Sequence, residues 1–118
     1  MQQHRNDLRA QYNQVIKMSK APENSSEQVK ERDKFNVEIS DISATGIHFI
    51  TSNEIEEGNK YIIELLVDKV IEKIVCKIVR VNFEGGKYDC GAKFEKMSYG
   101  TEKNIRAYVY RWEITRCR

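Results

Sequence analysis

Two short segments of this 118-residue chain carry side chains suited to a planar, phosphorylated ligand. Arg5 and Arg9 lie four residues apart near the start, and Asp41, Ser43 and Gly46 follow in a D-x-S-x-x-G arrangement. An arginine guanidinium is a planar fork that donates paired hydrogen bonds to phosphate or to the O6 and N7 acceptors of guanine. A carboxylate and a hydroxyl can accept from the N1 and N2 donors of the same base. The two segments together predict a nucleotide site.

The energy available from these groups is sufficient for a micromolar ligand. Charge-assisted hydrogen bonds contribute roughly 1.5–3 kcal/mol each, and micromolar affinity requires about 8 kcal/mol. Two arginines with base stacking and a few turn contacts supply that amount. Within residues 1–9, Leu8 is the side chain able to enter a core. We therefore expect this arginine leader to order on binding, at some cost in affinity.

Each segment also has an ordinary structural explanation. Paired arginines are common in solvated stretches of a chain with 20 basic residues. Asp41 and Ser43 can equally cap the backbone of their own turn, and Asp41 can aim the arginines. Gly46 either supplies a positive φ or lets a ligand approach the backbone. The functional interpretation therefore depends on finding both segments in one chain.

Alternating apolar and polar residues predict the strands that position these groups. Phe35, Val37 and Ile39 alternate with polar neighbours, the period of a half-buried strand. Tyr12 and Gln14 are expected on the same face of the first strand. Six strands are expected in all, at residues 12–18, 35–40, 47–51, 61–67, 70–81 and 88–94.

The end of the chain changes to the period of a helix. Four apolar or aromatic residues recur at i, i+3, i+4 and i+7, which places them on one helical face. Ser98 or Thr101 can cap the start of this helix. Its aromatic face is expected to belong to the core, with dimerisation or partner docking as the alternative. The stripe consists of Ile105, Tyr108, Val109 and Trp112.

Six strands followed by one helix predict a mainly β fold, a six-stranded antiparallel β-barrel with a C-terminal α-helix. Tight turns are expected at Asp68-Lys69 and at Glu84–Lys87, where two glycines mark a hairpin. The length suits a single domain, residues 1–118. Its expected parts are the arginine-bearing leader 1–10, the barrel 11–96 and the helix 97–118.

Composition narrows the class of function. The net charge of +2 argues against binding to DNA or RNA, which needs a clustered basic face. Cys76 and Cys90 are expected to fill the core, and with Cys117 they show no metal-ligand spacing or disulfide framework. Neither a signal peptide nor a membrane-spanning segment is evident, so a cytoplasmic protein without membrane insertion is expected.

The two segments resemble the signatures of the PilZ family, in an alignment reaching from Arg5 to the final helix. Residues 91–94, Gly-Ala-Lys-Phe, resemble the closing G-x-x-F pattern of that family, and the helix resembles that of flagellar-brake members. The resemblance implies a bacterial receptor for the second messenger cyclic di-GMP, bound at one rim of the barrel. It implies that Arg5 and Arg9 clamp guanine and phosphate above a floor of Asp41, Ser43 and Gly46.

The resemblance also raises questions of stoichiometry and context. His4 precedes Arg5 where many members carry a second arginine, so both one ligand and a stacked pair remain open. By the resemblance, His4 and Gly91 are further candidate contacts to the ligand. The N-terminal domain of two-domain brake proteins is missing, which fits a stand-alone protein or an excised domain. By analogy the partner belongs to the flagellar motor, secretion or polysaccharide machinery of motility or biofilm regulation. The chain is expected as a monomer or weak homodimer.

Two other binding functions are alternatives to the receptor. One is a ligand-independent PilZ-like adaptor that binds a protein partner. The other is a single-stranded nucleic-acid binder that stacks bases on Phe49, Tyr61 or Phe83. An enzyme is not expected, because the sequence shows no nucleophile–base pair, metal cluster or phosphate loop. His48 is interpreted as a surface or hydrogen-bonded histidine, and no cofactor or metal is expected besides the ligand.

Overall fold

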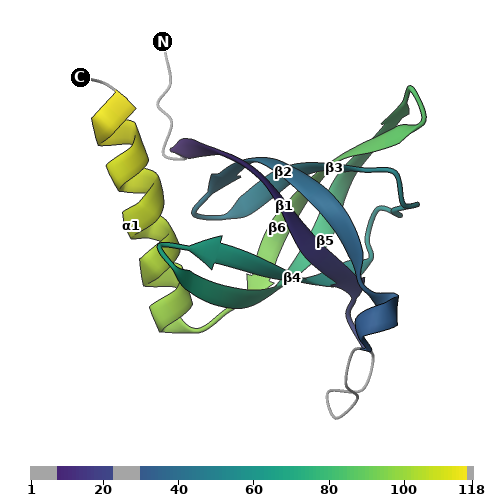
Figure 1. Ribbon diagram of the computed structural model, residues 1–118, viewed down its shortest axis with the longest axis horizontal. Coiled ribbons are helices and arrows are strands. Elements are labelled where there is room, and N and C mark those ends of the chain that lie inside the picture. The colour runs from purple at the N-terminus through teal and green to yellow at the C-terminus, as the bar shows by residue number, and fades with distance from the viewer. Residues whose placement is uncertain (1–7, 23–29, 117–118) are drawn as a thin grey trace.

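Six antiparallel strands close into a barrel, and one helix lies against an end of it (Figure 1). This computed structural model describes residues 8–22 and 30–116. The strands follow in the spatial order β1-β2-β3-β6-β5-β4, and β1 closes the barrel against β4. The predicted fold class is confirmed. The elements are β1 (Arg9–Lys20), a short 3-10 helix η1 (Glu31–Asp33), β2 (Phe35–Ser43), β3 (Gly46–Thr51), β4 (Lys60–Val67), β5 (Val70–Glu84), β6 (Lys87–Lys96) and α1 (Tyr99–Arg116).

The alternating apolar residues fill the barrel as predicted. Cys76 and Cys90 are both fully buried within this core. Phe49 is fully buried as well and Tyr61 is 5% exposed, so neither can stack a base from solution. The alternative in which these two aromatics form a nucleic-acid platform is therefore excluded. Phe83 is exposed, but its ring leans on Tyr88, with the two centroids 4.6 Å apart.

Several strand boundaries differ from the predicted ones, and two of them affect the site. β1 begins at Arg9, inside the segment 1–10 that was expected to be the leader. β2 continues through Asp41 to Ser43, so Asp41 belongs to a strand and not to the turn. Arg9 and Asp41 are consequently fixed by backbone pairing, which holds their side chains more firmly than a loop would.

Gln14 is exposed, although it was predicted to share the inward face of Tyr12. The pairing of β1 with β2 shifts register between Gln11 and Gln14. Asn13 has a φ of 50° at this bulge, in the left-handed region that asparagine tolerates better than most residues. The bulge turns the strand and moves Gln14 out of the core.

Both predicted tight turns are present. Asp68 and Lys69 have φ values of 50° and 71°, and Gly85 and Gly86 have values of 62° and 79°. Two successive residues of positive φ match the right-handed twist of the flanking strands, which makes each connection a compact hairpin. The β5–β6 hairpin extends beyond the barrel, away from α1 (Figure 1).

Helix α1 is capped and docked by specific polar contacts. The Ser98 hydroxyl accepts a hydrogen bond from the Thr101 N–H at 3.1 Å, which confirms one of the two predicted caps. The carboxylate of Glu72 on β5 accepts from the Thr101 hydroxyl at 2.6 Å and from the Asn104 amide at 2.8 Å. Ile105 of α1 is fully buried, as expected for the apolar stripe of this helix. No helix in the described part of the chain is long and apolar enough to cross a membrane.

The barrel closes along a short seam between β1 and β4. In the described part of the chain, Met18–Lys20 pair there with Tyr61–Ile63. Farther along, the Tyr12 hydroxyl donates to the Leu66 carbonyl at 2.7 Å and accepts from the Leu66 N–H at 2.9 Å. The Tyr12 hydroxyl thus bonds both the N–H and the carbonyl of Leu66. Elsewhere in the sheet a neighbouring strand supplies these two bonds. Burial raises the pKa of Tyr12, which keeps the hydroxyl protonated and able to donate.

Gly46 begins β3 at the point where β6 passes closest to it. A Cβ on Gly46 would overlap the carbonyl oxygen of Ala92 and would lie 3.3 Å from the Cα of Lys93. Gly46 does not have a positive φ. The expectation of a left-handed glycine is therefore wrong, and the glycine is required because another strand's backbone occupies the space of a side chain.

Replacing Tyr12 by phenylalanine is expected to lower the free energy of unfolding by about 1–3 kcal/mol, because Leu66 loses both hydrogen-bond partners. Chemical unfolding in urea measures the change, and Tyr99→Phe at a 78% exposed position is the control. The difference between wild type and Tyr12→Phe should persist below pH 10 and fade as the pH rises through the raised pKa of Tyr12. Equal stability of the two variants would contradict this role.

Gly46→Ala is expected to destabilise the fold by about 1–3 kcal/mol, because β6 must move away from β3. Gly100→Ala is the matched control, since its Cβ would meet nothing closer than the Ser98 hydroxyl at 3.9 Å. That substitution lies in α1 and should stabilise by up to about 1 kcal/mol through helix propensity. Thermal unfolding of both variants decides the matter, and a Gly46→Ala protein as stable as wild type would refute the packing argument.

Candidate functional site

The D-x-S-x-x-G segment is built around a buried hydroxyl. Ser43 ends β2 with its side chain fully buried. Its Oγ accepts hydrogen bonds from the N–H groups of Thr45 and Gly46, both at 3.2 Å. The Thr45 carbonyl accepts from the Phe94 N–H at 2.8 Å, which ties the turn to β6. Of the two roles open to Ser43, the structure shows the one of capping its own turn.

Arg9 and Asp41 form an ion pair on the outside of the barrel. Arg9 Nη1 lies 2.6 Å from Asp41 Oδ1, and the two side chains are 48% and 28% exposed. The pairing of Arg9 with Ser43 and of Gln11 with Asp41 brings β1 beside the end of β2. Asp41 therefore aims one of the predicted arginines, as expected. An ion pair this exposed contributes about 0–1 kcal/mol, so a ligand can open it at small cost.

His48 lies between two carboxylates. It is the cross-strand partner of Asp41 on one side and of Gly91 on the other. Its Nδ1 is 3.5 Å from Asp41 Oδ2, and its Nε2 contacts the Asp89 carboxylate. The Ser40 hydroxyl is a further neighbour of Nδ1, at 3.3 Å. The prediction of a hydrogen-bonded histidine is confirmed, and its place beside Asp41 connects that carboxylate to Asp89.

Arg80 lies over the outward side of Gly91. A Cβ added to Gly91 would lie 3.1 Å from Arg80 Nη2 and 3.6 Å from its Cζ, so the glycine leaves room for the guanidinium. A register shift between Ile78 and Arg80 aligns Arg80 with Gly91 across the β5–β6 pair. Within residues 8–22 and 30–116, Arg80 makes no ion pair with a carboxylate. A guanidinium fork is therefore available to an external acceptor.

These side chains surround one hollow of about 360 Å³. It receives residues from β1, β2, β3, β6 and β5, which are consecutive neighbours around the barrel. The hollow combines two guanidinium groups, a carboxylate and an imidazole with a backbone surface at Gly91. Such a combination suits a ligand with both phosphate and base edges. Its lining consists of Arg9, Asp41, Ile47, His48, Val79, Arg80, Gly91 and Ala92.

The remaining predicted site residues are distributed unequally. Gly46 and Ser43 do not line the hollow. Gly91, predicted as a further ligand contact, does line it. Arg5 and His4 lie outside the described residues. The structure therefore brings together Arg9, Asp41 and Gly91, whereas Ser43 and Gly46 are not part of the lining.

Thiol and metal chemistry find little support in the described chain. Burial raises the pKa of the Cys76 thiol to about 12 and that of Cys90 to about 11. Both thiols stay protonated near neutral pH and are poor nucleophiles. Among the described residues, no group of three or more histidine, cysteine or acidic side chains is arranged to hold a metal ion.

Three residues of the site were not assigned to it from the sequence. Arg80 and Asp89 come from β5 and β6, far along the chain from both signatures, and only strand pairing brings them there. His48 carried one usable signal, since it follows Gly46 by two positions and alternates outward from Ile47 and Phe49. No spacing rule signals Arg80, because its alignment depends on a bulge.

Known proteins agree with this architecture. The PilZ domain family matches residues 3–111 of the chain. A search of curated proteins finds no match. The PilZ domain of Escherichia coli YcgR with c-di-GMP is 12% identical, with a TM-score of 0.67 over 97% of this chain and 95% of that one.

Two further solved structures share the fold. The Bacillus subtilis inhibitor of motility MotI/DgrA is 18% identical, with a TM-score of 0.68, and the K. pneumonia MrkH–c-di-GMP complex is 13% identical, with a TM-score of 0.69. Each alignment covers 98% of this chain and 54% of the other, so this chain spans about half the length of those proteins. With the family match extending over residues 3–111 of a barrel of the same fold, the chain belongs to the PilZ domain family.

Proposed function

We propose that this chain is a cyclic di-GMP receptor module that binds the second messenger in the hollow between Arg9, Asp41 and Arg80. One observation carries the proposal: two signature residues meet in a hollow where a further arginine has no carboxylate partner among the described residues. Support also comes from the PilZ domain of YcgR and from MrkH, both of which have structures with c-di-GMP.

Each side chain of the hollow has a role in this proposal. Arg9 and Arg80 donate paired hydrogen bonds to phosphate oxygens or to guanine O6 and N7. Asp41 accepts from guanine N1 and N2, and His48 holds Asp41 in place from the side opposite Arg9. Gly91 lets the flat ligand approach the strand backbone.

The other predicted residues act less directly. Ser43 and Gly46 set the turn and the strand approach on which Asp41 and His48 depend. Arg5 supplies a third guanidinium beside those of Arg9 and Arg80, and His4 an adjacent contact, both from outside the described residues. Whether His4 admits one ligand or a stacked pair is decided by the binding stoichiometry.

The ligand-bound state is then signalled to a partner protein through the leader. Ligand that joins Arg5 to the hollow draws the leader against the barrel wall and changes the surface presented there. Such a change requires the ligand to bind the two states with different affinity. By family analogy the partner is a component of motility, secretion or polysaccharide machinery in the bacterial cytoplasm, and the module binds without catalysing a reaction.

Arg9→Ala and Arg5→Ala are each expected to weaken cyclic di-GMP binding about tenfold to a hundredfold, because each loses charge-assisted hydrogen bonds. Calorimetric titration measures this, with GMP and cyclic di-AMP as ligand controls. Arg32→Ala, at an exposed position of η1, is the matched arginine control. Unchanged affinity in Arg9→Ala would remove that arginine from the site. A folded wild type that binds no cyclic di-GMP would instead favour the ligand-independent adaptor.

Gly91→Ala is expected to weaken binding while leaving thermal stability close to wild type. The new Cβ meets only the end of the flexible Arg80 side chain, which moves aside instead of straining the backbone. Arg80→Ala should weaken binding about tenfold by removing the same guanidinium. The two losses should not add in the double variant, because both act through Arg80. Additive losses would show that Gly91 acts on the ligand directly and not through Arg80, and unchanged affinity in Arg80→Ala would remove Arg80 from the site.

A further inference from the structure

The projecting β5–β6 hairpin has one free edge. β5 pairs with β4 only as far as Lys77, and the adjoining loop bonds to Ile78 through Gly58 and Asn59 at 2.8 and 2.9 Å. Beyond Ile78, no strand among residues 8–22 and 30–116 pairs with this edge of β5. Unpaired peptide groups along a strand edge are a template for another strand.

The length of the regular edge is limited at both ends. A bulge between Ile78 and Arg80 interrupts the strand before Arg80, and the turn at Gly85 and Gly86 follows Glu84. The edge that can form an uninterrupted ladder is therefore residues 80–84. Its central residue is Asn82.

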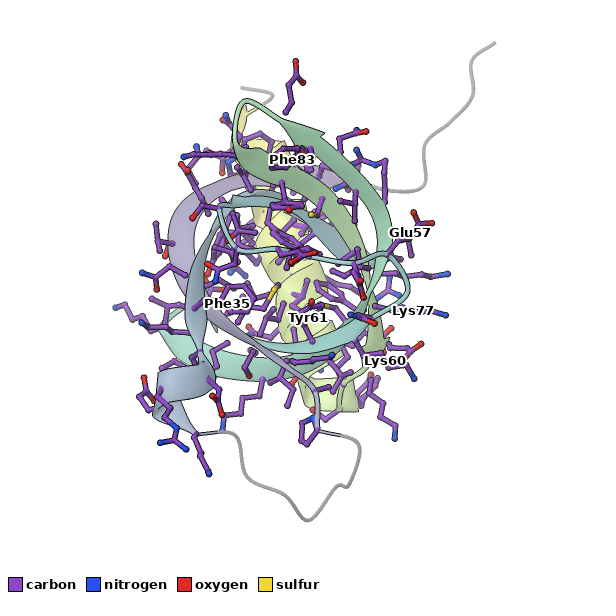
Figure 2. The ribbon with its side chains drawn as sticks, turned by 90° about the vertical axis from the view of Figure 1, so that its right-hand side faces the viewer. Phe35, Glu57, Lys60, Tyr61, Lys77 and Phe83 are labelled. Carbon is purple, nitrogen blue, oxygen red and sulfur yellow. The ribbon has the colours of Figure 1, made fainter. Side chains whose placement is uncertain are left out.

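The two faces of this edge differ in character. Arg80, Asn82 and Glu84 share the outward face, opposite Gly91, Asp89 and Lys87 of β6. Val81 and Phe83 share the opposite face. Val81 packs against the barrel core, and Phe83 lies farther along the hairpin. Phe83 is 62% exposed and lies on the hairpin beyond the barrel mouth (Figure 2). Natural edges are commonly blocked by lysine or proline, and residues 80–84 contain neither.

The sequence of this edge is self-complementary when two copies of it pair in antiparallel fashion. An antiparallel pairing of two copies centred on Asn82 sets Arg80 opposite Glu84 of the second copy. It sets Val81 opposite Phe83 of the second copy on the other face. A two-fold axis repeats each pair, so the ladder has two opposite-charge pairs and two apolar pairs.

We propose that residues 80–84 of β5 form an interaction surface for a second copy of this chain, which adds to the sheet edge to edge. Arg80 also lines the proposed ligand hollow, so the two proposals share this residue, whereas Glu84 belongs to the edge alone. The interface is short, and contacts of this size give weak association, so the dimer forms reversibly and depends on concentration. Phe83 loses its exposure to water in the pair.

Charge reversal at the paired positions tests the surface and its register together. In Arg80→Glu each edge presents two acidic residues, and in Glu84→Arg two basic ones, so each variant repels its own copy. Sedimentation velocity over a concentration series should show self-association about tenfold weaker in each variant than in wild type. An equimolar mixture of the two should associate again, since every pair in the mixed dimer has opposite charges.

Controls separate this surface from other causes. Lys17→Glu reverses the charge of an exposed residue on β1 and should associate like wild type. Glu84 lies outside the ligand hollow, so Glu84→Arg should lose self-association and keep its affinity for cyclic di-GMP. Recovery in the mixture excludes misfolding of the single variants.

Three results would overturn the proposal. Wild type that sediments as a monomer at millimolar concentration would leave the edge to a strand of another protein. Single variants that associate as well as wild type would place the contact elsewhere. A mixture that stays monomeric while each single variant is folded would refute the pairing centred on Asn82.

Discussion

β6 passes β3 so closely that the Ala92 carbonyl takes the space in which Gly46 would otherwise carry a side chain. This approach brings β3 and β6 into the register that sets His48 beside Gly91. Gly91 in turn faces Arg80 across the next pair of strands. The polar groups of the hollow are therefore positioned by backbone pairing around the barrel, and their own mutual contacts only refine the arrangement.

The hollow holds its own counter-ions before any ligand arrives. Asp41 contacts Arg9 on one side and His48 on the other, and His48 reaches Asp89. In the proposed complex, binding would be an exchange of partners, in which phosphate replaces a carboxylate at arginine and guanine replaces arginine at the carboxylate. Exposed pairs are cheap to separate, so discrimination depends on whether a ligand satisfies both sides at once.

The sequence predicted regular elements well where each residue reports on its own environment. Alternation located the strands, the i, i+3, i+4 stripe located α1, and paired turn residues located the hairpins at Asp68 and Gly85. The two bulges were not predicted. The bulge at Asn13 and the register shift before Arg80 depend on the pairing with a neighbouring strand and not on a local residue preference. The site was predicted where its residues lie in the signatures, and missed where pairing of distant strands supplies Arg80 and Asp89.

The structure constrains the two halves of the signature differently. Ser43 is buried against its own turn and Gly46 against β6, so any descendant that keeps this barrel has reason to keep both. Arg9 is half exposed, and its exposed ion pair contributes little to the stability of the fold. A chain that keeps D-x-S-x-x-G without Arg9 can therefore keep this barrel. That segment by itself is a marker of architecture and not of a ligand.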